Sequence, residues 1–237
     1  TEVTVDVTPP TGSVRVTDNI ISTEADGFDD TTRIIHNLSR DADWTGYIYV
    51  AGGDVIETLR LGSDFPTAVT WDGTNLAGDP VPDRTYSYSL IGTDPAGNQH
   101  ETEPVQVTID RRPTTLDLAV SREYFSPNGD GEGDVVIVTP QLSLRGGIAE
   151  YSFRIVDGDG TEVFSGSGTG SPPLEVAWDG QGPDGEVLPE GEYVGVLQLV
   201  YEKGNRPRAL TPVVTIDNTI PEVALRASSR RITPNGD

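Results

Sequence analysis

The sequence predicts an all-β protein in which tandem β-sandwiches follow one another along the chain. Three observations lead to this fold class. Segments of alternating polarity rich in Val, Thr, Ile and Tyr recur along the 237 residues, the 27 Gly and 18 Pro supply turns between them, and the chain repeats itself. The repeat interval, about 105 residues, is too long for a solenoid unit and is typical of a small sandwich that buries its own core.

Two landmarks define the repeat. The tetrapeptide "VTVD" at Val3–Asp6 returns as "VTID" at Val107–Asp110 and again at Val214–Asp217, so that its three aspartates lie at nearly equal intervals. "WDG" at Trp71–Gly73 returns one repeat later at Trp178–Gly180. The sequence therefore contains two complete units of one fold.

A third landmark is an acidic, glycine-rich loop. "ISTEADGFDD" at Ile21–Asp30 aligns with "FSPNGDGEGD" at Phe125–Asp134 when the chain is shifted by one repeat. A further copy starts as "ITPNGD" at Ile232–Asp237. The three landmarks together predict a third unit that begins near the last residues of the sequence, and they suggest that the chain is a fragment of something longer.

These landmarks predict the domain organisation. We expect the end of a preceding repeat or a linker at 1–6, the first sandwich at 7–110, the second at 111–217 and the first strand of a third at 218–237. Proline follows each "VT-D" tetrapeptide within a few residues and cannot donate to a sheet, so it ends one unit and stiffens the passage to the next. The short linkers predict units arranged end to end as a semi-rigid rod.

Each unit is predicted to contain about seven strands, the number found in an immunoglobulin-like sandwich. The hairpin of the second unit turns at Asp157–Gly160, where Asp and Gly tolerate positive φ. The first unit follows the same path, with its hairpin at Tyr47–Leu59. The strand-forming segments of the second unit are, in order, Thr115–Ser121, Asp134–Leu142, the hairpin Tyr151–Phe164, Leu174–Trp178, Glu192–Tyr201 and Leu210–Asp217.

Tryptophan and tyrosine recur at fixed spacing around a wide loop. Trp178 and Tyr193 bound "WDGQGPDGEVLPEGEY", and Trp71 and Tyr86 bound "WDGTNLAGDPVPDRTY". A tryptophan at a strand end and a tyrosine opening the next strand predict a structural ring pair that closes one end of each sandwich. The tyrosine stands where a tyrosine corner would place it, with its hydroxyl free to bond a nearby backbone group.

Several motifs of the sequence resemble those of known protein families. The pattern "WDG…G…P.G.Y" resembles the immunoglobulin-like module of the flagellar hook-capping protein family, and "FSPNGDGxxD" is similar to the opening motif of the same modules and of gliding-motility-associated C-terminal domains. "DPAGNQ" at Asp94–Gln99 resembles a turn of bacterial surface immunoglobulin-like repeats. The first unit departs from the pattern, because Arg84 replaces the glycine found at Gly191. The resemblance implies a secreted or surface-displayed array that scaffolds, spaces or adheres.

The loop at Phe125–Asp134 allows two interpretations. Asn128, Asp130, Glu132 and Asp134 offer oxygen ligands at alternating positions, the arrangement at the front of a calcium loop. Thr139 stands where an EF-hand would place a bidentate glutamate, so that a Ca²⁺ ion would need further ligands. The other interpretation is an Asx/Gly turn between strands.

Sandwich topology predicts where the further calcium ligands would lie. The loop after the first strand, the loop at Asp179 and the linker at Asp217 should gather at the end of the second unit that faces the third. A Ca²⁺ ion bound there would stiffen the rod.

Composition argues against several other functions. The net charge of −22 opposes nucleic-acid binding, and also adsorption to anionic lipid, because both need clustered Lys and Arg. Lys203 is the only lysine, a bias that fits either genome composition or a salty habitat. The sequence has no cysteine for disulfides or thiolate zinc sites, and no apolar run long enough to insert into a membrane. His36 and His100 both lie in the first unit, so no catalytic site is shared by the units and we expect no enzyme.

The leading functional prediction is a structural spacer. We expect non-catalytic repeats of a bacterial surface or secreted protein, located outside the cell or in the periplasm. Their partners would be the neighbouring repeats of the same chain and a cell-surface or polysaccharide ligand. One alternative is an adhesin or a carbohydrate-binding accessory module, which exposed aromatic rings in a planar row would favour, whereas burial of Trp71 and Trp178 favours the stalk. Another alternative is an assembly cap similar to the flagellar hook cap.

Overall fold

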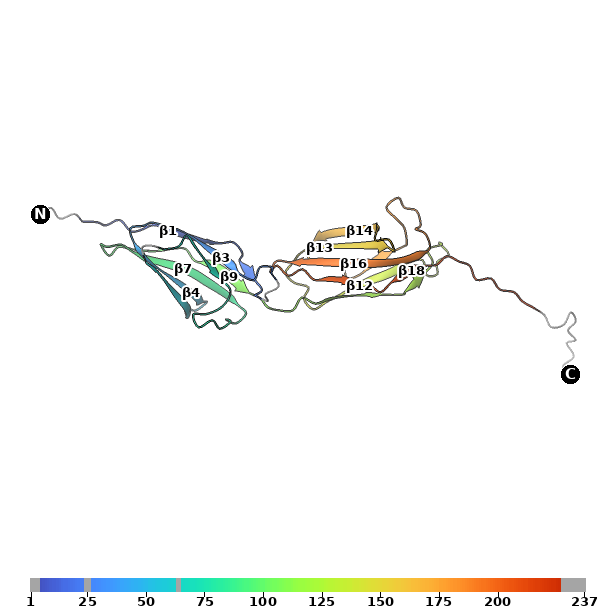
Figure 1. Ribbon diagram of the computed structural model, residues 1–237, viewed down its shortest axis with the longest axis horizontal. Helices are drawn as coiled ribbons and strands as arrows, with labels where there is room; N and C mark the ends of the chain where they lie inside the picture. Colours follow the sequence, from blue (N-terminus) through green and yellow to red (C-terminus); the bar gives the residue numbers. More distant parts are fainter. Residues whose placement is uncertain (1–4, 24–26, 63–64, 227–237) are drawn as a thin grey trace.

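The computed structural model describes residues 5–23, 27–62 and 65–226. Over these residues every regular element is a β-strand, and there is no helix long and apolar enough to cross a membrane. The strands form two sandwiches that follow one another along the long axis of the molecule (Figure 1). We call strands β1–β9 unit 1 and strands β10–β18 unit 2. The fold class is therefore all-β, with tandem immunoglobulin-like sandwiches placed end to end.

The two units contain equivalent strands in the same order. The strands of unit 1 are β1 (Gly12–Val16), β2 (Ile20–Ile21), β3 (Thr32–Leu38), β4 (Asp43–Val50), β5 (Val55–Gly62), β6 (Ala68–Trp71), β7 (Thr85–Thr93), β8 (Gln99–Glu101) and β9 (Val105–Ile109). Those of unit 2 are β10 (Leu116–Val120), β11 (Tyr124–Phe125), β12 (Val136–Leu142), β13 (Ile148–Asp157), β14 (Glu162–Thr169), β15 (Val176–Trp178), β16 (Gly191–Tyr201), β17 (Arg208–Leu210) and β18 (Val214–Ile216).

The sheet topology is identical in the two units. One sheet has the order β1-β3-β6 in unit 1 and β10-β12-β15 in unit 2. The other has the order β2-β9-β7-β4-β5 or β11-β18-β16-β13-β14, with β8 or β17 paired to the long strand β7 or β16. Within the described residues, each sandwich thus has nine strands, of which β2 or β11 has only two residues. Three-residue strands are β8 in unit 1 and β15, β17 and β18 in unit 2. The short β2 and β11 were not expected from the sequence.

Strands β2 and β11 carry the chain from one sheet to the other. In unit 2, β10 pairs with β12 in the first sheet, and the next strand, β11, pairs in parallel with β18 in the second sheet, with Phe125 opposite Ile216. In unit 1, β2 pairs in parallel with β9 in the same way, with Ile21 opposite Ile109. The acidic loop of unit 2 therefore follows β11 and starts beside the last strand of its own unit.

Each unit has its own core, built from the inward residues of both sheets. Along β4 the buried positions alternate, with Trp44 and Ile48 facing inward, as the two-residue period of a strand requires. In unit 2 the core includes Phe153, Leu197 and Leu199. Burying one such side chain stabilises the fold by about 1.5–3 kcal/mol. The two core clusters share no residue, so each core stabilises its own sandwich.

The predicted third repeat falls on the last described residues and beyond. Residues 218–226 contain no strand, and residues 227–237 lie outside the described part of the chain. At the other end, residues 5–11 also contain no strand, and 1–4 are not described. The domain limits proposed for these two segments therefore remain predictions.

Candidate functional site at the junction of the units

The only lysine of the chain lies buried where the two units meet. Lys203 is 3% exposed, and it sits in the turn between β16 and β17 of unit 2. Its ammonium donates to the backbone carbonyl of Asp110, at 3.2 Å, and to that of Arg112, and it lies 3.5 Å from the Asp110 carboxylate. A buried ammonium is costly unless it is surrounded by acceptors. Here the linker between the units supplies all three.

Asp110 is itself held in place by the linker. The guanidinium of Arg112 donates to both carboxylate oxygens of Asp110, at 2.9 and 2.7 Å. The hydrogen bond from the Arg112 side chain, with that from its backbone N–H and the charge of Lys203, lowers the pKa of Asp110 to about 2, against the opposing effect of burial. The Asp110 carboxylate therefore stays ionised opposite Lys203 throughout the neutral and mildly acidic range.

The neighbouring residue fastens the linker to unit 1. Arg111 donates from its backbone N–H and from its guanidinium to Asp83, at 2.7 Å in both cases, and from Nη1 to the carbonyl of Val81 at 2.8 Å. In unit 2 the equivalent linker N–H, that of Asn218, donates to Glu190 at 2.9 Å. Asp83 and Glu190 occupy corresponding positions of the repeat, so both units hold the start of the following linker with an acidic side chain.

A second contact joins the facing loops. An ideal Cβ built on Gly204 would lie 2.7 Å from the Cβ of Asp29, so the turn of unit 2 packs directly against the acidic loop of unit 1. Gly204 has φ +93°, a conformation that also favours glycine. Beside this contact, the guanidinium of Arg206 lies 5.1 Å above the ring of Phe28, within cation–π distance. The junction therefore has contacts on both the linker and the loop.

The predicted calcium ligands of unit 2 bond mainly to their own loop. Asp134 accepts the N–H groups of Gly129 and Gly131, both at 2.8 Å, and these bonds lower its pKa. Asn128 accepts the N–H of Asp130 at 3.0 Å, and Asp130 accepts that of Glu132 at 2.8 Å. This is the hydrogen-bond pattern of successive Asx turns.

The structure brings some of these residues together at the far end of unit 2. Asn128 and Asp134 line a hollow of about 340 Å³ with Asp179, and the N–H of Asp217 donates to the carbonyl of Phe125 at 3.0 Å. The exposed side chains of Asp130 and Glu132 do not line it.

Two carboxylates, those of Asp134 and Asp179, line this hollow, and a metal ion there would need further ligands. Among the described residues, which include the whole of this loop, no group of three or more His, Cys, Asp or Glu side chains is placed to hold one. Calcium binding therefore stays a prediction.

The recurring tryptophan and tyrosine lie edge to face inside each sandwich. The ring centroids of Trp71 and Tyr86 are 5.3 Å apart, as are those of Trp178 and Tyr193. The hydroxyl of Tyr86 donates to the carbonyl of Pro82 at 2.7 Å, and that of Tyr193 to the carbonyl of Pro189 at 2.8 Å. All four rings are buried, so none of them offers a stacking surface to a sugar.

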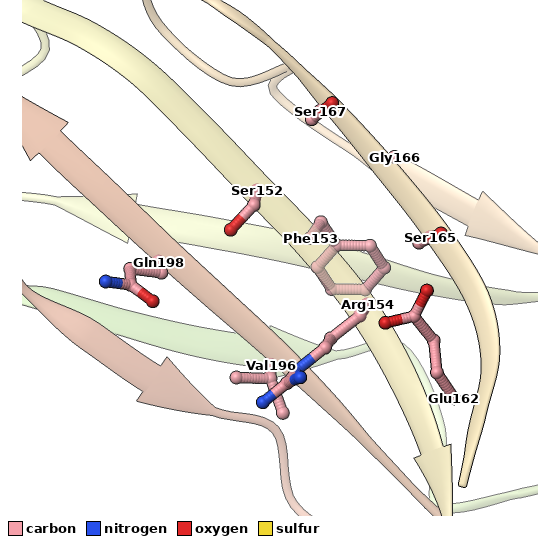
Figure 2. A pocket seen from close by; sticks show the side chains of 9 residues that line it. All are labelled: Ser152, Phe153, Arg154, Glu162, Ser165, Gly166, Ser167, Val196 and Gln198. Carbon is pink, nitrogen blue, oxygen red and sulfur yellow. The ribbon is translucent and has the colours of Figure 1, made fainter.

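The outer face of the larger sheet of unit 2 carries a shallow hollow. Figure 2 shows its lining, in which Ser152 and Arg154 of β13 face Ser165 and Ser167 of β14. The hollow measures about 400 Å³ and most of the side chains that line it are polar, whereas Phe153 belongs to the buried core. No aromatic ring is exposed among the residues that line it.

Sequence reasoning did not identify the junction residues. Lys203 has no counterpart in unit 1, where Ala96 occupies the corresponding position, so comparison of the repeats does not single it out. One signal was present in the sequence, since the only lysine of an acidic chain stands in a Gly-Asn turn. Its partner Asp110, 93 residues away, became visible only in the folded chain.

Comparison with known proteins adds a family similarity in unit 2. A protein-family model described as "CHU_C Type IX secretion signal domain" matches residues 119–211, which run from β10 to just beyond β17. This is less than half of the chain. No curated protein matches the chain. The resemblance to the flagellar hook-capping module stays a prediction.

Several solved structures are similar to this chain at low sequence identity. The tetra-tandem repeat in the extending region of a large adhesion protein is 13% identical, with a TM-score of 0.39, over 89% of this chain and 50% of that one. Fibronectin(III)-like modules of Clostridium thermocellum CbhA are 11% identical, with a TM-score of 0.43, over 90% and 100%. A 1.5-MDa bacterial ice-binding adhesin is 14% identical, with a TM-score of 0.42, over 88% and 65%. The chain thus spans half the length of the first of these structures. The described part of the chain folds as two immunoglobulin-like sandwiches, the second of which is similar to a type IX secretion signal domain.

Proposed function

We propose that this chain is a stiff, non-catalytic spacer in the stalk of a secreted or surface-displayed bacterial protein. The observation that carries the proposal is the burial of Lys203 between the units, where it binds the linker carbonyls of Asp110 and Arg112. A linker held from both sides cannot act as a free hinge, so the two sandwiches extend as one rod. Burial of Trp71 and Trp178 further favours a spacer over a sugar-binding module.

The rate at which the Lys203 amine is acylated tests whether the two units are docked, because Lys203 is the only lysine of the chain. In the docked protein we expect Lys203 to be acylated at least about tenfold more slowly than a lysine in a free peptide, the factor that corresponds to about 1.4 kcal/mol of protection. Mass spectrometry of the labelled chain gives the rate. Equal rates would mean that the units are not docked in solution.

Two glycine substitutions provide a matched pair for the same measurement. Gly204→Ala would place a methyl group against Asp29, whereas Gly97→Ala affects the equivalent turn of unit 1, where nothing lies within 4 Å of the added Cβ. Both glycines have similar φ values, +93° and +90°, so the backbone strain is the same. We expect Gly204→Ala to expose Lys203 and to shorten the maximum dimension in small-angle scattering, and Gly97→Ala to do neither. The same effect from both variants would remove the support for a specific junction.

A second role is favoured by the family match in unit 2. The similarity of residues 119–211 to a type IX secretion signal domain supports unit 2 as the part of the chain that directs export. A reporter fused to the chain, in a bacterium with type IX secretion, should reach the cell surface or the medium. The control replaces unit 2 with a second copy of residues 7–110, and it should leave the reporter inside. Equal export by the two fusions, or export by neither, would contradict this role.

A further inference from the structure

The turn that buries Lys203 has a counterpart at the free end of unit 1. The turn from Asp94 to Asn98 joins β7 to β8, as the turn from Tyr201 to Asn205 joins β16 to β17. In both turns the first residue donates its N–H to the carbonyl of the last, at 3.1 and 2.9 Å. In both, the glycine donates to the carbonyl of the first residue, again at 3.1 and 2.9 Å. The two turns therefore have the same pattern of backbone hydrogen bonds.

The two turns differ in burial. Lys203, Gly204 and Asn205 are all buried, since unit 1 covers them. In the turn of unit 1, Ala96 and Gly97 are exposed. The same backbone is therefore an interface in one unit and open surface in the other.

The open turn nevertheless holds a linker. The side-chain amide of Asn98 donates to the backbone carbonyl of Asp6 at 3.2 Å. Asp6 is the residue that corresponds to Asp110 in the repeat, and the carbonyl of Asp110 accepts from Lys203. Asn98 is fixed in this position by the carboxylate of Asp94, to which its side-chain amide donates at 2.8 Å. Each turn thus binds the carbonyl of the linker aspartate that precedes its own unit.

Space for a facing loop is also present. A hollow of about 450 Å³ lies beside the open turn, lined by residues 40–42 of the β3–β4 loop, by Asp43 at the start of β4, and by Thr93, Asp94 and Pro95. At the junction of the two units, the acidic loop of unit 1 contacts the turn of unit 2, with Asp29 touching Gly204.

We infer that the Asp94–Asn98 turn is the docking surface for another immunoglobulin-like unit, joined ahead of unit 1 through Asp6, and that this joint is the more compliant of the two. The inference rests on the proposed spacer role. The occupant is identified by the Asp6 contact and by the covered, equivalent turn of unit 2. It would present to unit 1 the linker carbonyl and the acidic loop that unit 1 presents to unit 2.

The greater flexibility of the joint at Asp6 follows from the residue at position 96. Ala96 stands where unit 2 has Lys203, so the linker carbonyl meets a neutral amide in place of a buried ammonium. The segment 93–100 contains one Asp and no Lys or Arg, whereas 201–208 contains one Lys and two Arg beside one Glu. Hydrogen bonds from charged donors are roughly twice as strong as those between neutral groups, and an acidic loop is attracted only by the second of these segments. The joint at Asp6 therefore bends more readily than the joint at Asp110.

A head-to-tail fusion of two copies of the chain tests the docking surface, with Asp217 of the first copy followed directly by Val7 of the second. We expect hydrogen exchange at Ala96–Gln99 of the second copy to slow several-fold relative to the single chain, because the first copy covers this turn. Exchange at the same residues that is equal in the fusion and in the single chain would overturn the docking surface. The proposed rod would survive that result, since it depends on Lys203.

The absence of cysteine allows the compliance to be measured with pairs of engineered cysteines carrying spin labels. We expect the distance distribution across the new joint to be broader than that across the joint at Asp110, and Ala96→Lys in the second copy to narrow it. Ala96→Gln is the matched control, because it adds length without charge and should leave the distribution broad. Equal widths at the two joints before substitution, or equal narrowing by both variants, would overturn the compliance.

Discussion

His36 makes the stability of unit 1 sensitive to acid. Its Nδ1 lies 3.0 Å from the carbonyl of Pro66, which can only accept, so Nδ1 carries the proton of the neutral ring. Nε2 is then free to accept from the hydroxyl of Tyr88, also at 3.0 Å. Burial lowers the pKa of His36 and raises that of Tyr88, so both groups are neutral at pH 7. A proton added to Nε2 would remove the acceptor of the Tyr88 hydroxyl inside the core.

We therefore expect unit 1 to lose stability as the pH falls below 6.5. The folded-state pKa of His36 is lower than its ordinary value of 6.5, so acid favours the unfolded state, which binds the proton more tightly. Unit 2 contains no histidine and should keep its melting temperature between pH 6.5 and 5. Unit-resolved melting by NMR measures both. His100→Gln is the control and should leave the pH dependence in place, and an equal loss of stability in the two units would contradict the assignment to His36.

At the scale of elements, the acidic loop of unit 2 is held by its own side chains. Asp134 accepts two backbone N–H groups from Gly129 and Gly131, so it acts as the cap of the loop whether or not a cation binds nearby. The same carboxylate was predicted from its spacing to bind calcium.

Asp134→Ala separates the two interpretations. We expect the melting temperature of unit 2 to fall by a few degrees in the presence of a chelator, because two loop N–H groups lose their acceptor. If the loop is an Asx/Gly turn, addition of calcium leaves the melting temperature of the unaltered chain unchanged. Glu132→Ala is the control, because the Glu132 side chain caps none of these N–H groups. A calcium-dependent stabilisation that both variants abolish would establish the ion site instead.

The sequence predicts the longer elements better than the short ones. The alternating segments and the spacing of Trp178 and Tyr193 predict the sandwich and the ring pair, because both depend on local pattern. Strands β2 and β11 contain two residues each, and their pairing partners lie about 90 residues away, at Ile109 and Ile216. No periodicity is readable in two residues. The pairing of such short strands depends on tertiary contacts alone.

At the scale of the whole molecule, the junction could not be predicted because it arises where the two repeats differ. Comparing the units reveals what they share, whereas Lys203 and Arg206 occur only in unit 2 and Phe28 only in unit 1. In the sequence, the linker between the two units is marked only by its proline. In the folded chain that linker is held by Arg111 on one side and by Lys203 on the other.

The parallel pairing of β2 with β9 and of β11 with β18 has a mechanical consequence. When the two ends of the chain are pulled apart along the rod, the strand near the start of each sandwich and its last strand are drawn in opposite directions along their shared ladder. The load then falls in shear on hydrogen bonds such as those from Asp110 to Ile21 and from Asp217 to Phe125. In that geometry the bonds must break together, whereas an antiparallel hairpin pulled at its open end would unzip one bond at a time. Strands β2 and β11, which could not be predicted from the sequence, therefore give each unit its resistance to tension.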